Sequence, residues 1–132
     1  MGGQTAGYRF GKTKRLLNAN DYSRVFDNPD ARASHRHILL LGKLNDGPEH
    51  RLGLVIAKKN VRSAVQRNRI KRLTREFFRI LPNSELPMDV VLLARQGIGQ
   101  LDNAELSSIL LQQWQMLVHH AAKTITSTNQ ES

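Results

Sequence analysis

The strongest chemical signal in the sequence is a basic segment between Lys58 and Arg79, where nine lysines and arginines accompany a single acid. Its second half, QRNRIKRLTREFFR (residues 66–79), places apolar residues at intervals of three and four, which is typical of an amphipathic helix. Arginine outnumbers lysine here, and its planar guanidinium suits phosphate oxygens and stacking. These residue types favour the binding of a polyanion.

The charges of this predicted helix gather on one side. Ile70, Leu73 and Phe77 share a sector of about 60° that we expect to pack on a sheet. Thr74 and Ile80 lie at the edges of that sector. An ordinary solvated face usually mixes signs, because like charges four residues apart repel each other. The opposite sector instead holds one amide and four cations, which favours polyanion binding over simple solvation: Asn68, Lys71, Arg72, Arg75 and Arg79.

Two aromatic residues, Tyr22 and Phe26, stand four residues apart in NANDYSRVF, which predicts a short helix capped by Asn18 or Asn20. Their spacing alone favours a packing role against a sheet. The alternative is a pair of stacking platforms for single-stranded RNA, which requires aromatic rings beside a positive groove. We expect the aromatic residues of the later helices to be structural: Phe77, Phe78 and Trp114.

No active site formed by the protein alone is evident. The segment Gly97–Gly99 follows a predicted strand like a dinucleotide-binding loop, but Asp102 stands where the third glycine would be and would repel a pyrophosphate. The 11 acids form no obvious pair for general acid–base catalysis. Four histidines form two pairs in the sequence: His35 with His37, and His119 with His120. The first pair is expected on one face of a predicted strand. Neither pair has an acidic or thiol partner at a metal-site spacing. We therefore expect no metal site and no catalytic residue in the protein.

Composition narrows the class of protein further. The chain has 132 residues, no cysteine, a net charge of +9 and a pI near 10.7. Disulfides and thiolate zinc sites are excluded, and the charge favours polyanionic partners. Its apolar runs are too short to span a bilayer, so we expect a cytoplasmic protein without a membrane partner. We predict one domain over residues 1–132, with a basic arm at 1–14 and a flexible tail at 124–132.

The predicted strands lie in the middle of the chain. Residues 35–44 and 51–58 are rich in aliphatic residues, and the turn-forming NDGPEH lies between them, so we predict an antiparallel hairpin. DVVLLAR (residues 89–95) predicts a further strand whose unbroken apolar run indicates burial on both faces.

The basic helix is predicted to run from about Ser63 to before Pro82, and a last helix to start at Asp102, with Glu105 completing a capping box. A strand on each side of the basic helix predicts a βαβ crossover, and the element order predicts two layers around one sheet. The last helix has apolar residues at helical spacing: Leu106, Ile109, Leu110, Trp114, Leu117, Val118 and Ala121.

An ordered series of motifs over roughly residues 8–118 resembles the protein subunit of bacterial ribonuclease P: RFGKTKRLLNANDYSRVF, RLGLVIAKKN, RNRIKRLTREFFR, DVVLLAR and LDNAELSSILLQQW. The resemblance implies an α+β fold, a two-layer sandwich with a central four-stranded mixed sheet, three helices and a left-handed βαβ crossover. It also implies partnership with a large catalytic RNA that removes the 5′ leader of precursor tRNA with Mg²⁺, without an obligate protein partner.

The resemblance also implies roles for individual residues. Those expected to bind the RNA subunit are Arg62, Arg67, Asn68, Arg69, Lys71, Arg72, Arg75 and Arg79. Those expected to line a cleft for the single-stranded leader are Tyr22, Phe26, Lys58 and Lys59, which reverses the packing role that spacing favours for the aromatic pair. Those of the basic arm are Phe10, Lys12 and Arg15. The chain departs from the family pattern at Asn60, where glycine often follows the paired lysines, and at Tyr22, where phenylalanine is frequent.

Three other functions fit the basic helix less well. A structural RNA-binding protein, such as a ribosomal component, would share the charge pattern. A DNA-binding factor would need a helix-turn-helix partner for the basic helix, and none is evident. A nuclease with its own active site would need acids that the sequence does not group together.

Overall fold

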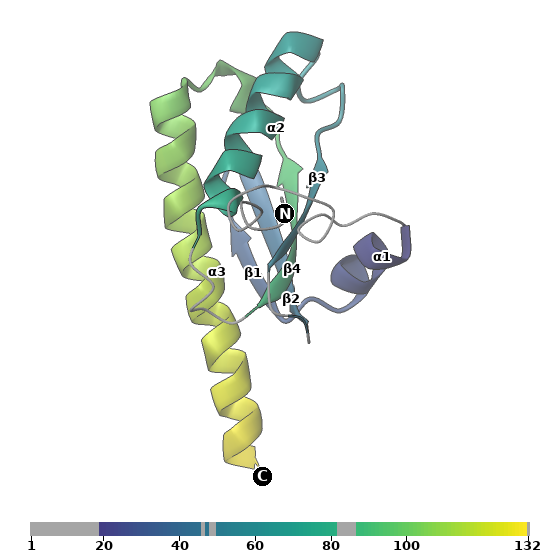
Figure 1. The fold of residues 1–132 in the computed structure, drawn as a ribbon, viewed down its shortest axis with the longest axis vertical. Helices are drawn as coiled ribbons and strands as arrows, with labels where there is room; N and C mark the ends of the chain where they lie inside the picture. Colours follow the sequence, from purple (N-terminus) through teal and green to yellow (C-terminus); the bar gives the residue numbers. More distant parts are fainter. Residues whose placement is uncertain (1–18, 46, 48–49, 82–86, 132) are drawn as a thin grey trace, which may run out of the picture.

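The computed structural model describes residues 19–45, 47, 50–81 and 87–131, with side chains described as far as Thr124. Its elements follow the order α1 (Ala19–Asp27), β1 (Ala31–Ser34), β2 (Ile38–Leu44), β3 (Arg51–Val55), α2 (Ala64–Arg79), β4 (Met88–Ala94), the 3₁₀ turn η3 (Ile98–Gln100) and α3 (Asn103–Glu131). The strands form one mixed sheet in the order β1-β2-β4-β3. This confirms the predicted α+β fold with a four-stranded mixed sheet and three α-helices (Figure 1).

The predicted hairpin between residues 35–44 and 51–58 is wrong, because β4 lies between β2 and β3. β4 pairs antiparallel with β2 and parallel with β3, so the predicted crossover β3–α2–β4 is confirmed. The physical reason is burial. The first five residues of β4 are fully buried, and a central position covers such a strand on both sides.

The hairpin partner of β2 is β1, a strand that the sequence patterns did not predict. Its four residues, ARAS, alternate buried alanine with exposed polar residues, a pattern too short and too weakly apolar to stand out. Residues 35–37 form the turn between β1 and β2, so His35 and His37 do not lie on a strand as predicted.

The two faces of the sheet are covered unequally. α2 and α3 pack on one face and enclose the main core, which includes Leu40, Leu92, Ile70 and Trp114. α1 lies on the opposite face, over a smaller cluster centred on Val25. Figure 1 shows α3 and α1 on either side of the strands. The sheet and the α2–α3 pair are therefore the two principal layers, and α1 adds a partial third.

α3 begins with the predicted capping box. The main-chain N–H of Asp102 donates to Glu105 Oε1 (2.9 Å), and that of Glu105 donates to Asp102 Oδ1 (2.8 Å). The helix continues to Glu131, so it includes residues 124–131 of the predicted tail, whose flexibility stays a prediction. The helix is packed on the sheet as far as Thr124, because Ala121 is buried and Thr124 donates to the carbonyl of Asp30 (2.9 Å). No helix in the described part of the chain has both the length and the apolar character to cross a membrane.

Candidate nucleic-acid interface

The basic helix α2 is anchored by a cap and an apolar stripe. Ser63 is the N-cap, and its side chain accepts a hydrogen bond from the Gln66 main-chain N–H (3.3 Å). Ile70, Thr74 and Phe78 are buried. The buried stripe is thus rotated from the predicted one, because α2 packs on α3 as well as on the sheet.

The aromatic residues of α2 and α3 have the structural role that the sequence predicts. Phe78 stacks edge-on against Trp114, with ring centroids 5.4 Å apart. Phe77 is partly buried against the same core. Ile80, predicted at the edge of the packed sector, is 55% exposed. The helix ends at Arg79, so Ile80 no longer follows the helical phase.

The outward face of α2 is a continuous basic surface. One shallow hollow of about 300 Å³ is lined by six residues: Asn68, Lys71, Arg72, Arg75, Glu76 and Arg79. All of them except Glu76 were grouped by the face prediction. Glu76 and Arg79 form an ion pair, so the hydrogen bond from Arg79 lowers the pKa of Glu76. Among the residues that the structure describes, Lys71, Arg72 and Arg75 have no acidic partner. We call these six residues the α2 face.

Two further arginines of this helix are directed at the protein itself. Arg67 donates to the main-chain carbonyls of Val61 (3.0 Å) and Arg62 (2.9 Å), which closes the segment before the helix. Arg69 connects α2 to the start of α3 through hydrogen bonds to Gln66 Oε1 (2.7 Å), Asn103 Oδ1 (2.7 Å) and the carbonyl of Leu101 (2.9 Å). Helical periodicity could not reveal these contacts, since most acceptors lie outside the helix.

The paired lysines lie in the turn after β3, where Lys58 and Lys59 are exposed. Asn60 closes this turn, because its side-chain amide donates to the carbonyl of Ala94 (2.9 Å). No non-glycine residue in the described part of the chain has a positive φ, so this turn forms without glycine after the lysines. Lys59 and the exposed Arg62 line a second hollow of about 400 Å³.

The sheet face below α1 is organised in rows set by strand register. Leu41, Val91 and Gly53 form the middle row, and Leu39, Leu93 and Val55 form the next row toward the lysine turn. Leu41 and Val91 are buried under α1 together with Val25, whereas the next row is only partly buried. Leu39, Leu93 and Val55 thus form a strip of partly exposed apolar side chains beside α1, which we call the open strip.

The two aromatic residues of α1, Tyr22 and Phe26, differ in how far they are buried. Tyr22 is partly buried and packs on Gly53, where an added Cβ would lie 2.5 Å from the Tyr22 ring. Phe26 is 41% exposed. The packing role that spacing favoured therefore fits Tyr22 better than Phe26. Of the two predicted caps of α1, Asn20 lies inside the helix, which starts at Ala19. Asn18 lies outside the described residues.

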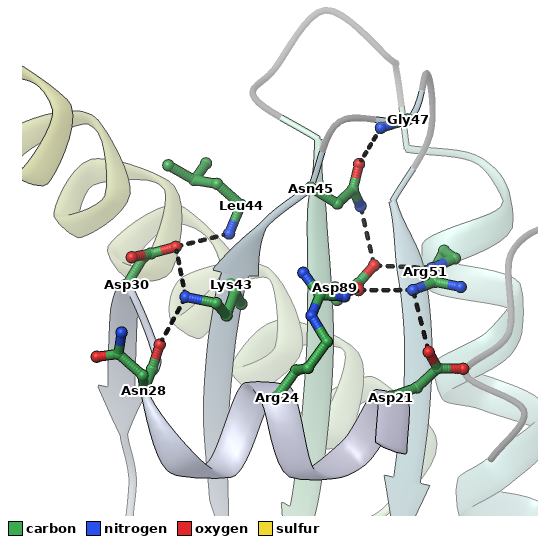
Figure 2. Close-up of polar contacts among 10 residues, drawn as sticks. All are labelled: Asp21, Arg24, Asn28, Asp30, Lys43, Leu44, Asn45, Gly47, Arg51 and Asp89. Carbon is green, nitrogen blue, oxygen red and sulfur yellow. Dashed lines mark hydrogen bonds and ion pairs between the residues drawn. The ribbon is translucent and has the colours of Figure 1, made fainter. Parts of the chain in front are cut away.

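A polar network joins α1 to the sheet (Figure 2). Asp89 on β4 is fully buried and accepts hydrogen bonds from Arg51 Nε (2.8 Å), Arg51 Nη2 (2.7 Å) and Asn45 Nδ2 (2.9 Å). Arg24 of α1 donates to the same carboxylate (3.3 Å), and Arg51 also pairs with Asp21 of α1 (3.5 Å). Burial raises the pKa of Asp89, but the hydrogen bonds and charges of its partners outweigh this, so its pKa lies below the ordinary value.

The histidines do not form a metal centre in the part of the chain that the structure describes, where no group of three potential ligands comes together. His37 Nδ1 lies 3.0 Å from the carbonyl of Gln96, and its main-chain N–H donates to His35 Nδ1 (3.1 Å). Burial, followed by the nearby charges of His37, Arg36 and Arg95, lowers the pKa of His35. His120 Nδ1 accepts from the main-chain N–H of Arg32 (3.0 Å).

The predicted arm residues Phe10, Lys12 and Arg15 lie outside the described residues. The remaining predicted positions fall in three places: the α2 face, the hollow after β3 that Lys59 and Arg62 share, and the aromatic residues of α1. Three cations of the α2 face that lack an acidic partner among the described residues, together with the exposed Lys58 and Lys59, define the class: a basic α+β protein with the surface of a nucleic-acid-binding protein.

Comparison with known proteins identifies the family. The ribonuclease P family model matches residues 10–118. The ribonuclease P protein component of Pseudomonas paraeruginosa is 45% identical over 87% of this chain and 85% of its own length. That of Saccharophagus degradans is 42% identical over 94% of this chain and 91% of its own length. The chain therefore belongs to the family of bacterial ribonuclease P protein subunits, which take part in tRNA processing.

The fold agrees with a solved structure of the Staphylococcus aureus RNase P protein, to which this chain is similar with a TM-score of 0.73 and 24% sequence identity. The similarity covers 81% of this chain and 99% of that chain.

Proposed function

We propose that this chain binds the large catalytic RNA subunit of ribonuclease P and the 5′ leader of precursor tRNA, and thereby assists Mg²⁺-dependent removal of the leader. The observation that carries the proposal is the α2 face, where Lys71, Arg72 and Arg75 point outward without an acidic partner among the described residues. Family membership supports RNA as the polyanion.

The RNA subunit binds the α2 face and the adjoining Arg62 in this proposal. Unpaired cations release counterions from the RNA on contact, so each contact to a phosphate contributes to affinity. Arg67 and Arg69 act differently from the outward cations, because their donors already bond main-chain carbonyls and Asn103. Their role is to fix the start of α2 so that Asn68 and its neighbours face the RNA.

The leader binds beside α1. The open strip formed by Leu39, Leu93 and Val55 offers an apolar floor for bases. Phe26 offers a partly exposed ring for stacking, and Tyr22 forms the wall next to Gly53. Lys58 and Lys59 neutralise leader phosphates at the end of β3. The arm residues Phe10, Lys12 and Arg15 complete this surface in the proposal.

Hydrolysis is carried out by the RNA subunit, and Mg²⁺ is held mainly by RNA and substrate. The carboxylate of Asp89 is engaged by Arg51 and Arg24, which makes it a poor general base. The protein contributes phosphate neutralisation, so that RNA folding and metal binding require less Mg²⁺. The setting is the cytoplasm, where precursor tRNA is processed.

The decisive experiment is reconstitution with the cognate large RNA and precursor tRNA at low Mg²⁺. We expect the protein to raise cleavage strongly, and mature tRNA to bind less tightly than leader-bearing tRNA. No effect of the protein on cleavage would contradict the proposal and favour a structural RNA-binding role. Cleavage by the protein without the large RNA would refute the assignment of catalysis to RNA.

A further inference from the structure

The helix α1 makes few apolar contacts with the sheet. It has nine residues, fewer than an isolated helix needs to be stable in water. Within this helix, which the structure describes throughout, Val25 is the one buried residue. With one buried aliphatic side chain and the partly buried Tyr22 ring, α1 has few apolar contacts to fix the direction of its axis and its rotation.

The missing constraint is a group of four charged residues that we call the Asp89 clamp: Asp89, Arg51, Arg24 and Asp21. Two of them belong to the sheet and two to α1, so the clamp joins the layers directly (Figure 2). Arg51 holds Asp89 with two hydrogen bonds, of 2.8 and 2.7 Å, a fork that fixes both orientation and distance. Two acids balance two arginines, so these cations are used within the protein.

The clamp lies next to the aromatic residues of the proposed cleft. In the sheet, Arg51 and Asp89 are partners in register, and Gly53 and Val91 are the next pair on the same face. Tyr22 follows Asp21 directly in α1 and rests on Gly53. A shift of α1 would therefore move the Tyr22 ring off Gly53 and change the position of Phe26 above the open strip.

We propose that the Asp89 clamp is the positioning device of the leader cleft, with Asp89 acting through α1 to set where Tyr22 and Phe26 meet the leader. The inference rests on the proposed function, because it assumes that the leader binds beside α1. It assigns a role in substrate binding to a residue that is fully buried on the sheet and touches no RNA.

The test compares two clamp variants, Asp89→Asn and Arg24→Gln, in holoenzyme reconstituted with the large RNA. Arg24 has a half-exposed side chain, so Arg24→Gln keeps the fold and remains informative if Asp89→Asn does not fold. Asp30→Asn is the matched control, since Asp30 pairs with Lys43 (3.8 Å) and accepts from the Leu44 main-chain N–H (2.9 Å) outside the clamp.

We expect Asp89→Asn to reduce the affinity gained from the leader by about tenfold, which is the effect of removing one stacked base. Arg24→Gln should reduce this affinity by a few-fold and Arg24→Lys should restore part of it, while affinity for mature tRNA stays unchanged in all variants. Amide hydrogen exchange should become faster in α1 and stay constant in α2 and α3. Asp30→Asn should behave as the unaltered protein does.

Two results would overturn the inference in distinguishable ways. If Tyr22→Ala and Phe26→Ala lose the leader-dependent affinity but both clamp variants keep it, the clamp has only a structural role and the proposed function still holds. If Tyr22→Ala and Phe26→Ala keep it as well, the proposed leader site is wrong, and the inference fails with it.

Discussion

The helices α1 and α2 lie on opposite faces of the sheet, and both carry arginine. In α2, the apolar stripe around Ile70 sits in the main core, and Arg67 and Arg69 fix the start of the helix, so its position does not depend on the outward cations. Arg72 and Arg75 point outward and have no acidic partner among the described residues. In α1, Arg24 turns toward the sheet and bonds the buried Asp89.

This difference teaches that the number of cations in a segment does not give the number available to RNA. A helix with a large buried stripe can leave its charges unpaired, whereas a helix with one buried residue uses charges for docking. We therefore predict that charge removal at α1 will affect stability and the leader cleft, whereas charge removal at α2 will affect affinity for the large RNA. The following experiments test that separation.

The largest effect is expected on stability at the clamp. Asp89→Asn should lower the free energy of unfolding by about 3 kcal/mol, because it removes the buried anion that Arg51 and Arg24 both bond and leaves Arg51 with only the more distant Asp21. Urea unfolding followed by Trp114 fluorescence would measure this. Arg72→Gln on the α2 face is the control and should stay within about 0.5 kcal/mol of the unaltered protein. Equal losses in both variants would remove the proposed distinction between the two helices.

The carboxylate of Asp89 should also make the stability of the protein depend on pH. The pKa of Asp89 is lower in the folded protein than its unfolded value of about 3.9. Its contribution to stability is therefore complete above that unfolded value and is lost as the pH falls toward the folded pKa. Urea unfolding at pH 7 and pH 3 should show that the free energy of unfolding falls less between these pH values in Asp89→Asn than in the unaltered protein. A parallel loss in the two proteins would contradict a clamp that depends on ionised Asp89.

At the α2 face, the double variant Arg72→Gln with Arg75→Gln should weaken binding of the large RNA by about 2 kcal/mol, or roughly 30-fold. The slope of log affinity against log salt should fall by about 0.7 to 0.9 for each phosphate that the protein no longer neutralises. Filter binding at several salt concentrations would measure both quantities. Arg24→Gln should leave the slope unchanged, and an unchanged slope in the double variant would place these arginines in solvent.

The smallest effects are expected at the aromatic residues of α1. Phe26→Ala should weaken binding of leader-bearing tRNA by about 1 kcal/mol without loss of stability, because its ring is partly exposed. Tyr22→Ala should lower leader affinity and also stability, because its ring packs on Gly53. Competition binding with and without the leader, together with urea unfolding, would separate the two. Equal losses for mature tRNA would indicate packing alone.

Local patterns in the sequence predicted much of this fold. The bounds of α2, the capping box of α3 and the burial of β4 all follow from residues within about one turn or one strand of each other. The outward position of Arg72 and Arg75 follows in the same way, because helical geometry alone places them opposite Ile70. These parts could be predicted since every residue involved is a near neighbour in the chain.

The pairing of the strands and the docking of α1 were decided only by the tertiary structure. β4 enters between β2 and β3 because burying its apolar run on both faces outweighs the short loop that would favour a hairpin. Arg24 and Asp89 are 65 residues apart, so no local sequence pattern predicts their contact. The sequence alone determined which residues are charged and which face of a helix they occupy. Only the folded chain decided which charges are paired within the protein, because burial and pairing depend on groups that the fold brings together from distant positions.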